Sequence, residues 1–97
     1  MSISLKNRTA LVTGAAGFLG LQHCEALAKV GCNVILTDIA TEGLQGACRQ
    51  LSKKYPDNEF YFFLMDVSKE QSVKFIKERL EKQEIPIDIL INNAAIN

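Results

Sequence analysis

The chain carries the glycine-rich stretch TGAAGFLG at Thr13–Gly20. The apolar, partly β-branched run Thr9–Thr13 leads into it and is typical of a buried strand. The segment Leu19–Val30 follows and has the pattern of a helix. Each of the three glycines loses more backbone entropy on folding than alanine would. So many glycines between a strand and a helix indicate a backbone conformation or a close approach that alanine does not allow.

Three segments show the spacing of amphipathic helices. The first, Leu19–Val30, is followed by Gly31, which suits the left-handed residue that ends many helices. The second runs from about Thr41 to Lys54, and the third opens at Ser68, where Gln71 completes a capping-box pattern. The apolar residues expected to be buried are Leu19, Ala26, Leu27 and Val30 in the first helix, Leu44, Ala47, Cys48 and Leu51 in the second, and Val73, Ile76 and Leu80 in the third.

Four apolar runs alternate with these helices. They are Thr9–Thr13, Asn33–Asp38, Glu59–Asp66 and Ile87–Ile91. Because the runs are almost continuously apolar, they predict parallel strands that are buried on both faces. Right-handed crossovers then give a Rossmann-like, doubly wound α/β sheet of the form β-α-β-α-β-α-β, with the strand order 3-2-1-4.

Charge and hydropathy exclude several classes of function. Eleven basic and eleven acidic side chains give a formal net charge of zero, so we expect no nucleic-acid partner and no binding to an anionic membrane. No segment approaches the ~20 apolar residues of a membrane span. The glycines interrupt the first apolar run, unlike the core of a signal peptide, and we therefore expect a cytoplasmic protein.

The cysteines and the single histidine give no support for a metal site. Cys24, Cys32 and Cys48 are an odd number without a CxxC pair, and each has apolar neighbours. We expect them to be small buried thiols in a reducing compartment. His23 has no partner at a ligand spacing and is expected to be a surface or partly buried helix residue.

The glycine stretch lies where a doubly wound sheet binds ligands, beyond the carboxyl ends of the strands at the point where the strand order reverses. There Gly14 would permit a tight turn, and Gly17 would let a pyrophosphate approach bare backbone. Gly20 would let the helix pack close to the strand. The helix N-terminus would bring unpaired N–H groups and a partial positive charge toward the phosphate.

Asp38 follows Gly20 at close to the ~20-residue spacing expected of a carboxylate on an adenosine ribose. The alternative is an aspartate that caps a turn or a helix. A carboxylate at the ribose accepts from a free 2′-hydroxyl and repels a 2′-phosphate. No lysine or arginine lies between Gly14 and Gly20 or directly after Asp38 to offset that repulsion, so the sequence favours NAD over NADP.

Polar residues end the third and fourth predicted strands as well. Asp66 could accept from an adenine amino group, or it could cap the turn that Ser68 follows. The amides of Asn92 and Asn93 could tie neighbouring strand ends together, although on their own they are typical of a turn.

Residues at four places now resemble the short-chain dehydrogenases/reductases. They are TGAAGFLG after the first strand, Asp38 after the second, Asp66-Val67 after the third and Asn92–Ala95 (NNAA) after the fourth. The motifs occur in the family's order, cover nearly the whole chain and belong to the cofactor-binding half of the family. The resemblance implies that residues 1–97 are a partial NAD(P)-binding Rossmann domain, incomplete relative to the family.

The resemblance also implies a dinucleotide site. It places Gly14, Gly17 and Gly20 at the pyrophosphate, Asp38 at the adenosine ribose, Asp66 and Val67 around adenine, and Asn93, Ala94 and Ala95 near the ribose and the central strand. Phe18, Leu19 and Ile39 are further cofactor-binding candidates. A complete enzyme of this kind would take a small-molecule alcohol or carbonyl substrate and form a homo-oligomer.

Two departures from the family's commonest pattern bear on the subfamily. The glycine spacing is TGxxGxxG in place of TGxxxGxG, with Phe18 where the middle glycine usually falls. That spacing is similar to the extended, nucleotide-sugar-modifying members of the family. Ala95 stands in place of the glycine of NNAG, and NNAA is otherwise similar to the oxidoreductase branch.

The catalytic Tyr-x-x-x-Lys of the family has no counterpart here. Tyr55 is followed four residues later by Glu59, and Tyr61 by Met65. Hydride transfer needs a positioned acid or base in addition to the cofactor, so we expect no catalysis from this chain alone. Three hypotheses follow: the N-terminal part of an NAD-dependent oxidoreductase, a fragment of an extended-type epimerase or dehydratase, or a stand-alone nucleotide-binding module whose fourth strand pairs with a partner.

Overall fold

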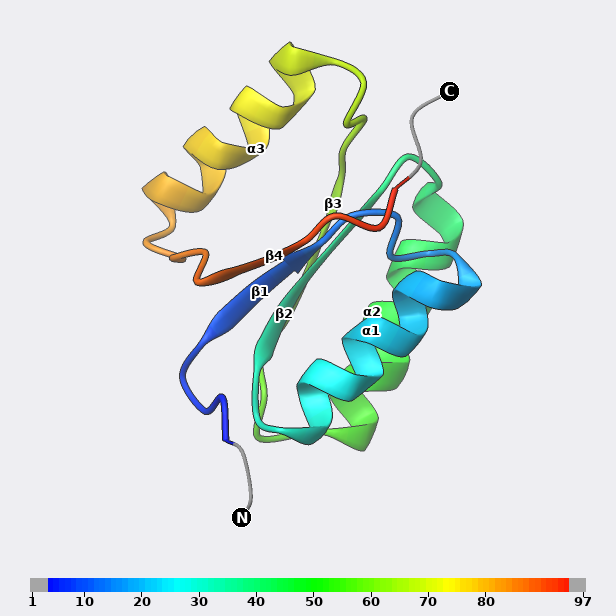
Figure 1. Cartoon of the computed structure of the whole chain (residues 1–97), viewed down its shortest axis with the longest axis vertical. Coiled ribbons are helices and arrows are strands. Elements are labelled where there is room, and N and C mark those ends of the chain that lie inside the picture. The colour runs from blue at the N-terminus through cyan, green and yellow to red at the C-terminus, as the bar shows by residue number, and fades with distance from the viewer. Residues whose placement is uncertain (1–3, 95–97) are drawn as a thin grey trace.

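The computed structural model describes residues 4–94 of the chain. Its elements are β1 (Thr9–Val12), α1 (Phe18–Lys29), β2 (Asn33–Asp38), α2 (Thr41–Lys54), β3 (Phe60–Leu64), α3 (Glu70–Lys82) and β4 (Ile89–Ile91). The four strands are parallel and form one sheet in the order β3-β2-β1-β4, which confirms the predicted topology (Figure 1).

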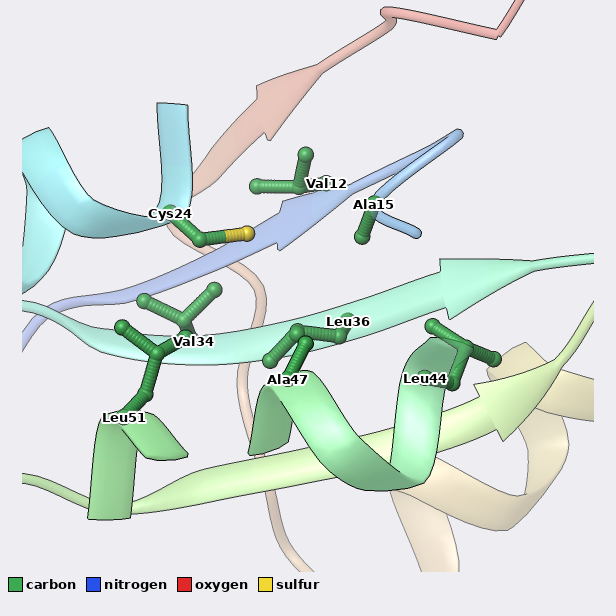
Figure 2. Packing of buried hydrophobic residues seen from close by; sticks show 8 residues of the cluster. All are labelled: Val12, Ala15, Cys24, Val34, Leu36, Leu44, Ala47 and Leu51. Carbon is green, nitrogen blue, oxygen red and sulfur yellow. The ribbon is translucent and has the colours of Figure 1, made fainter. Parts of the chain in front are cut away.

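Helices α1 and α2 cover one face of the sheet, called the closed face below (Figure 1). Strand residues at alternate positions supply its core, since successive side chains of a strand point to opposite faces. Figure 2 shows these residues interlocking with side chains from both helices and from the glycine-rich loop. The buried members of this cluster are Val12, Ala15, Cys24, Val34, Leu36, Leu44, Ala47 and Leu51.

Helix α3 lies on the other face, called the open face below, and covers it only in part (Figure 1). Its buried cluster is Leu11, Ile35, Met65, Ile76 and Leu80. A cavity of about 390 Å³ lies beside α3, and most of its lining side chains are apolar, among them Leu11 and Leu90. Because Leu11 and Leu90 are register partners on β1 and β4, they point to the same face.

The second helix agrees with its sequence pattern and the first does not. Leu44, Ala47, Cys48 and Leu51 are the buried residues of α2, as predicted. In α1 the buried residues are Gly20, Cys24 and Ala28. Of the predicted stripe, Leu27 packs against the closed-face cluster, whereas Leu19 and Ala26 are exposed, so the prediction is wrong for those two. Helix α1 turns its smallest side chains to the sheet because it packs directly against the loop that precedes it.

The chain between β3 and α3 also differs from the prediction. Helix α3 begins at Glu70, and no side chain within residues 4–94 caps it. The Ser68 hydroxyl instead donates to Asp66 Oδ1 at 2.6 Å, so the predicted capping box does not form. Strand β3 is only half-buried, because it is an edge strand whose one neighbour in the described part of the chain is β2.

Several smaller expectations are confirmed. Cys24, Cys32 and Cys48 are buried free thiols, and burial raises the pKa of Cys24 to about 12. Gly31 has φ +91° directly after the C-cap of α1, the left-handed conformation expected of it. His23 is exposed on α1. Within residues 4–94, the helices are all too short or too polar to cross a lipid bilayer.

Candidate functional site

The glycine-rich loop begins at Gly14, whose backbone only glycine adopts easily. Its φ is +64°. A Cβ at this position would also lie 3.0 Å from Asn93 Nδ2 and 3.1 Å from the Ala94 Cα. Both the turn and the close approach of the segment after β4 therefore require glycine here.

The Thr13 hydroxyl joins the ends of β1 and β4. It accepts hydrogen bonds from the backbone N–H groups of Asn93 at 2.9 Å and Ala94 at 3.0 Å. It also lies 3.1 Å from Asn92 Oδ1, to which it donates, and Asn93 Nδ2 donates to the Gly14 carbonyl at 3.2 Å. The asparagines thus tie the strand ends together, as their position predicted. Thr13 was not among the predicted site residues, and its signal is a hydroxyl placed directly before the first glycine.

Gly20 and Gly17 serve different purposes. A Cβ on Gly20 would lie 2.1 Å from the Gly14 carbonyl oxygen and 2.8 Å from the Ala15 Cα, so α1 can approach the loop only with glycine here. A Cβ on Gly17 would meet only the Gly14 oxygen among the described residues, at an ordinary 3.6 Å. Since the fold does not require glycine at 17, the bare backbone there leaves room for a ligand.

The N-terminus of α1 faces this space without a capping group from the protein. Gly17 is the N-cap, no side chain within residues 4–94 caps the helix, and its first turn holds no acidic residue. The first turns of α2 and α3 hold Glu42 and Glu70. The initial N–H groups of α1 lack partners within the helix and carry its positive dipole end, which suits an anion such as a phosphate.

The Asp38 carboxylate holds the loop against the end of β2. Its Oδ2 accepts from the Ala16 N–H at 2.9 Å, and its Oδ1 accepts from the Ala40 N–H at 3.0 Å. The neighbouring Ala15 N–H donates to the Thr37 carbonyl at 2.9 Å. The aspartate therefore fixes the loop, and each of its oxygens keeps a lone pair for a further donor.

Apolar side chains surround the loop on its exposed side. Phe18 is 79% exposed, Leu19 58% and Ile39 67%, although each is large and apolar. Phe18 is the first residue of α1, and Ile39 directly follows β2. Apolar side chains next to convergent backbone donors are typical of a ligand site.

Asp66 and Val67 lie at the end of β3 but do not join the glycine-rich loop. Hydrogen bonds from the Ser68 hydroxyl and N–H hold the pKa of Asp66 below its ordinary value. This carboxylate forms the turn that the sequence left as an alternative. Val67 packs against the open-face cluster. The structure therefore gathers Gly14, Asn93 and Ala94 at one point and Asp38 at the loop, with Asp66 set apart, while Ala95 lies outside the described residues.

The two tyrosines are engaged elsewhere. The Tyr55 hydroxyl donates to Glu25 at 2.9 Å. The Tyr61 hydroxyl donates to Glu59 at 2.6 Å, a bond that raises the pKa of Tyr61 to about 12. Neither is followed by a lysine at the family's spacing. Within residues 4–94, neither tyrosine is placed to supply a proton at the loop.

Comparison with known proteins agrees with this geometry. The family model for short chain dehydrogenases matches residues 8–97. An uncharacterized oxidoreductase of Bacillus subtilis, YxjF, is 35% identical over 92 residues, which are 95% of this chain and 35% of that protein. Nodulation protein G of Azospirillum brasilense is 38% identical over 93 residues, 95% of this chain and 37% of that protein.

Among solved structures, L-sorbose reductase of Gluconobacter frateurii, complexed with NADPH and L-sorbose, superimposes with a TM-score of 0.91 at 27% identity. The match covers 99% of this chain and 36% of that one. The chain spans between 13% and 37% of the length of the curated relatives it matches. On the family match, the sheet order and the glycine-rich loop, the chain belongs to the short-chain dehydrogenase family.

Proposed function

We propose that this chain binds a nicotinamide dinucleotide as the cofactor-binding part of a short-chain oxidoreductase, and that it prefers NAD to NADP. One observation carries the proposal: the N-terminus of α1, which no side chain of residues 4–94 caps, and the Asp38 carboxylate flank the same glycine-rich loop. A dinucleotide needs both a donor site for its pyrophosphate and an acceptor for its adenosine ribose.

The residues of the loop have separate roles in this proposal. The backbone from Gly17 to Gly20 receives the pyrophosphate, and Gly14 keeps the loop in its turn. Asp38 accepts from the ribose hydroxyls with the lone pairs that Ala16 and Ala40 leave free. Ile39 and Val67 border the adenine, with Asp66 at its rim. The bound nicotinamide supplies the hydride carrier, and the substrate of the complete protein would be an alcohol or a carbonyl compound.

The preference for NAD rests on local charge. Asp38 and the first-turn residue Glu42 of α2 are both acidic, and the loop Gly14–Gly20 holds no basic residue. A 2′-phosphate would meet this negative charge without a cation to offset it. Two of the similar proteins, the L-sorbose reductase and RhlG from Pseudomonas aeruginosa, form complexes with NADPH and NADP, respectively. The preference therefore needs a direct competition experiment.

The test is calorimetric titration of the chain with NAD and with NADP, repeated for Asp38→Asn and Asp38→Ala. We expect NAD to bind the unmodified chain about tenfold more tightly than NADP, which corresponds to ~1.4 kcal/mol. The amide oxygen of an asparagine at position 38 would still accept from the Ala16 N–H. Asp38→Asn should therefore mainly reduce the ratio of the NAD affinity to the NADP affinity. Asp38→Ala removes both the charge and the loop contact and should weaken both dinucleotides. Unchanged NAD affinity in Asp38→Ala would refute the ribose role.

Other parts of the proposal extend beyond this chain. A homo-oligomeric, cytoplasmic enzyme remains our prediction for the complete protein. The extended-type enzyme and the stand-alone module remain alternatives, and sequence beyond Asn97 would separate them. A downstream Tyr-x-x-x-Lys would supply the proton donor that residues 4–94 do not place at the loop.

A further inference from the structure

Helix α2 comes close to the glycine-rich loop at Gly43. This residue lies in the first turn of α2 and packs over Ala16. A Cβ on Gly43 would lie 2.9 Å from the Ala16 Cβ, closer than two carbon atoms can sit without a shift. The next nearest atoms, the Ala16 oxygen and Cα, would be at an ordinary 3.7 and 3.8 Å.

Ala16 cannot move aside easily, because its backbone is held from the other side. Its N–H donates to Asp38 Oδ2 at 2.9 Å, and the preceding Ala15 is fully buried in the closed-face cluster. The Ala16 Cβ is attached directly to this backbone, and alanine has no side-chain rotamer that could move it away from Gly43. An added methyl group at position 43 must therefore displace either the loop or the start of α2.

A second glycine on the same helix gives a matched reference. Gly46 also lies within α2, yet a Cβ there would meet no atom of the described residues within 4 Å. Glycine in a helix is unfavourable relative to alanine, so both positions forgo the same helix propensity. Of these two positions, only Gly43 has a close contact that explains why glycine stands there instead of alanine.

We propose that Gly43 is a positioning residue for the dinucleotide. Because Gly43 has no side chain, α2 can pack directly against Ala16. Ala16 then keeps the position in which its N–H donates to Asp38, and the loop keeps its binding conformation. This inference rests on the proposed function for its ligand, NAD, but concerns a residue that makes no contact with the ligand in that proposal. It predicts that a methyl group at position 43 weakens binding through Ala16.

The experiment compares Gly43→Ala, Gly46→Ala, Ala16→Gly and the double variant Ala16→Gly/Gly43→Ala in the full chain. NAD affinity is measured by calorimetry, and exchange of the Ala16 amide hydrogen is followed by NMR without dinucleotide. Gly46→Ala should bind NAD within about twofold of the unmodified chain, whereas Gly43→Ala should bind about tenfold more weakly. The Ala16 amide should exchange faster in Gly43→Ala than in Gly46→Ala, because its bond to Asp38 is strained.

The double variant identifies the cause. With the Ala16 Cβ removed, an alanine at position 43 meets only ordinary contacts, so the double variant should bind NAD within about threefold of Ala16→Gly alone. Equal NAD affinity in Gly43→Ala and Gly46→Ala would overturn the proposal. If Gly43→Ala does not fold, the double variant must restore folding and binding, and its failure would also overturn the proposal. If the unmodified chain binds neither NAD nor NADP, the proposed function fails, while exchange of the Ala16 amide still decides the role of Gly43.

Discussion

The two faces of the sheet differ in how completely this chain covers them. On the closed face two helices bury Val12, Leu36 and Leu44 fully. On the open face one helix, α3, lies on the sheet (Figure 1). A cavity of about 390 Å³ remains beside it, and Leu90 is 63% exposed. Exposed apolar surface next to an apolar cavity is typical of a place where further protein or a ligand packs.

The two halves of the candidate site are also held to different extents, because one belongs to the closed face and the other follows β4. The loop that would hold the pyrophosphate belongs to the closed face, where Ala15 is packed in the core and Asp38 holds Ala16. The segment after β4 has one neighbouring strand, β1, and is held there mainly through Thr13. The proposed pyrophosphate loop is thus held by the closed face, whereas the segment after β4 depends mainly on Thr13.

The largest expected effect comes from Gly20, where α1 meets the loop. In Gly20→Ala the new Cβ would lie 2.1 Å from the Gly14 carbonyl oxygen, and backbone on both sides must shift. We expect the free energy of unfolding to fall by about 4 kcal/mol, measured by urea denaturation. Gly46→Ala is the control: its Cβ would meet no atom of residues 4–94 within 4 Å, so this substitution should be neutral or stabilising. Equal stabilities would mean that the closed face is looser than the structure shows.

The second effect compares equivalent leucines on the two faces. Leu36 on β2 is fully buried on the closed face, and Leu11 on β1 is 4% exposed beside the open-face cavity. Leu36→Ala creates a closed cavity and should lower the free energy of unfolding by about 3 kcal/mol. Leu11→Ala enlarges an existing cavity and should lower it by about 2 kcal/mol. Chemical denaturation of both variants measures the difference. A larger loss for Leu11→Ala would reverse the ranking of the two faces.

The third effect tests whether the open face is bare in solution. Leu90→Lys places a charge on a side chain that is already exposed, so stability should change by less than about 0.5 kcal/mol. Thermal unfolding at two protein concentrations, tenfold apart, provides the measurement. A loss above about 2 kcal/mol, or a midpoint that rises with concentration, would indicate that this face is covered by another copy of the chain.

The fold could be predicted well because several apolar runs and helical periods in the sequence each indicate the same alternation of strands and helices. Strand β2 has its predicted bounds because it is a continuous apolar run between polar residues. Helix α2 has its predicted bounds and buried residues because its apolar residues follow the helical period. The strand order followed from right-handed crossovers, a rule that needs no detail of packing. The pattern failed for α1, where the size of Gly20, Cys24 and Ala28 decides which side faces the sheet. Close packing selects small residues there, and hydropathy does not report size.

The candidate site was less predictable for a related reason. Glycines and strand-end acids mark a sequence, but the partner of each group depends on the fold. Asp66 stabilises a turn because the Ser68 hydroxyl, two residues further on, donates to its carboxylate. Thr13 and Gly43 were missed because their importance lies in contacts with residues far along the chain, Asn93 and Ala16. Such contacts carry no local signal of composition or periodicity.

The smallest expected effect is a pH-dependent link between the two helices of the closed face. Glu25 on α1 accepts hydrogen bonds from Lys54 and from the Tyr55 hydroxyl at the end of α2, and these hold the pKa of Glu25 below its ordinary value of 4.5. Because the folded-state pKa is the lower one, this stabilisation is fully present above pH 4.5 and is lost as the pH falls through the folded-state pKa. The Lys54 side chain is 63% exposed, so solvent screens the pair and the effect is small.

Glu25→Gln isolates this link. The unmodified chain should be slightly more stable than the variant at pH 7, and the difference should shrink between pH 5 and pH 3, as measured by urea denaturation at each pH. Asp66, whose pKa is also lowered, titrates in both proteins and cancels from the difference. Added salt should reduce the difference at pH 7, because the Glu25–Lys54 pair is partly electrostatic. A difference that is constant from pH 7 to pH 3 would show that packing joins the two helices of the closed face and that the Glu25 charge contributes nothing.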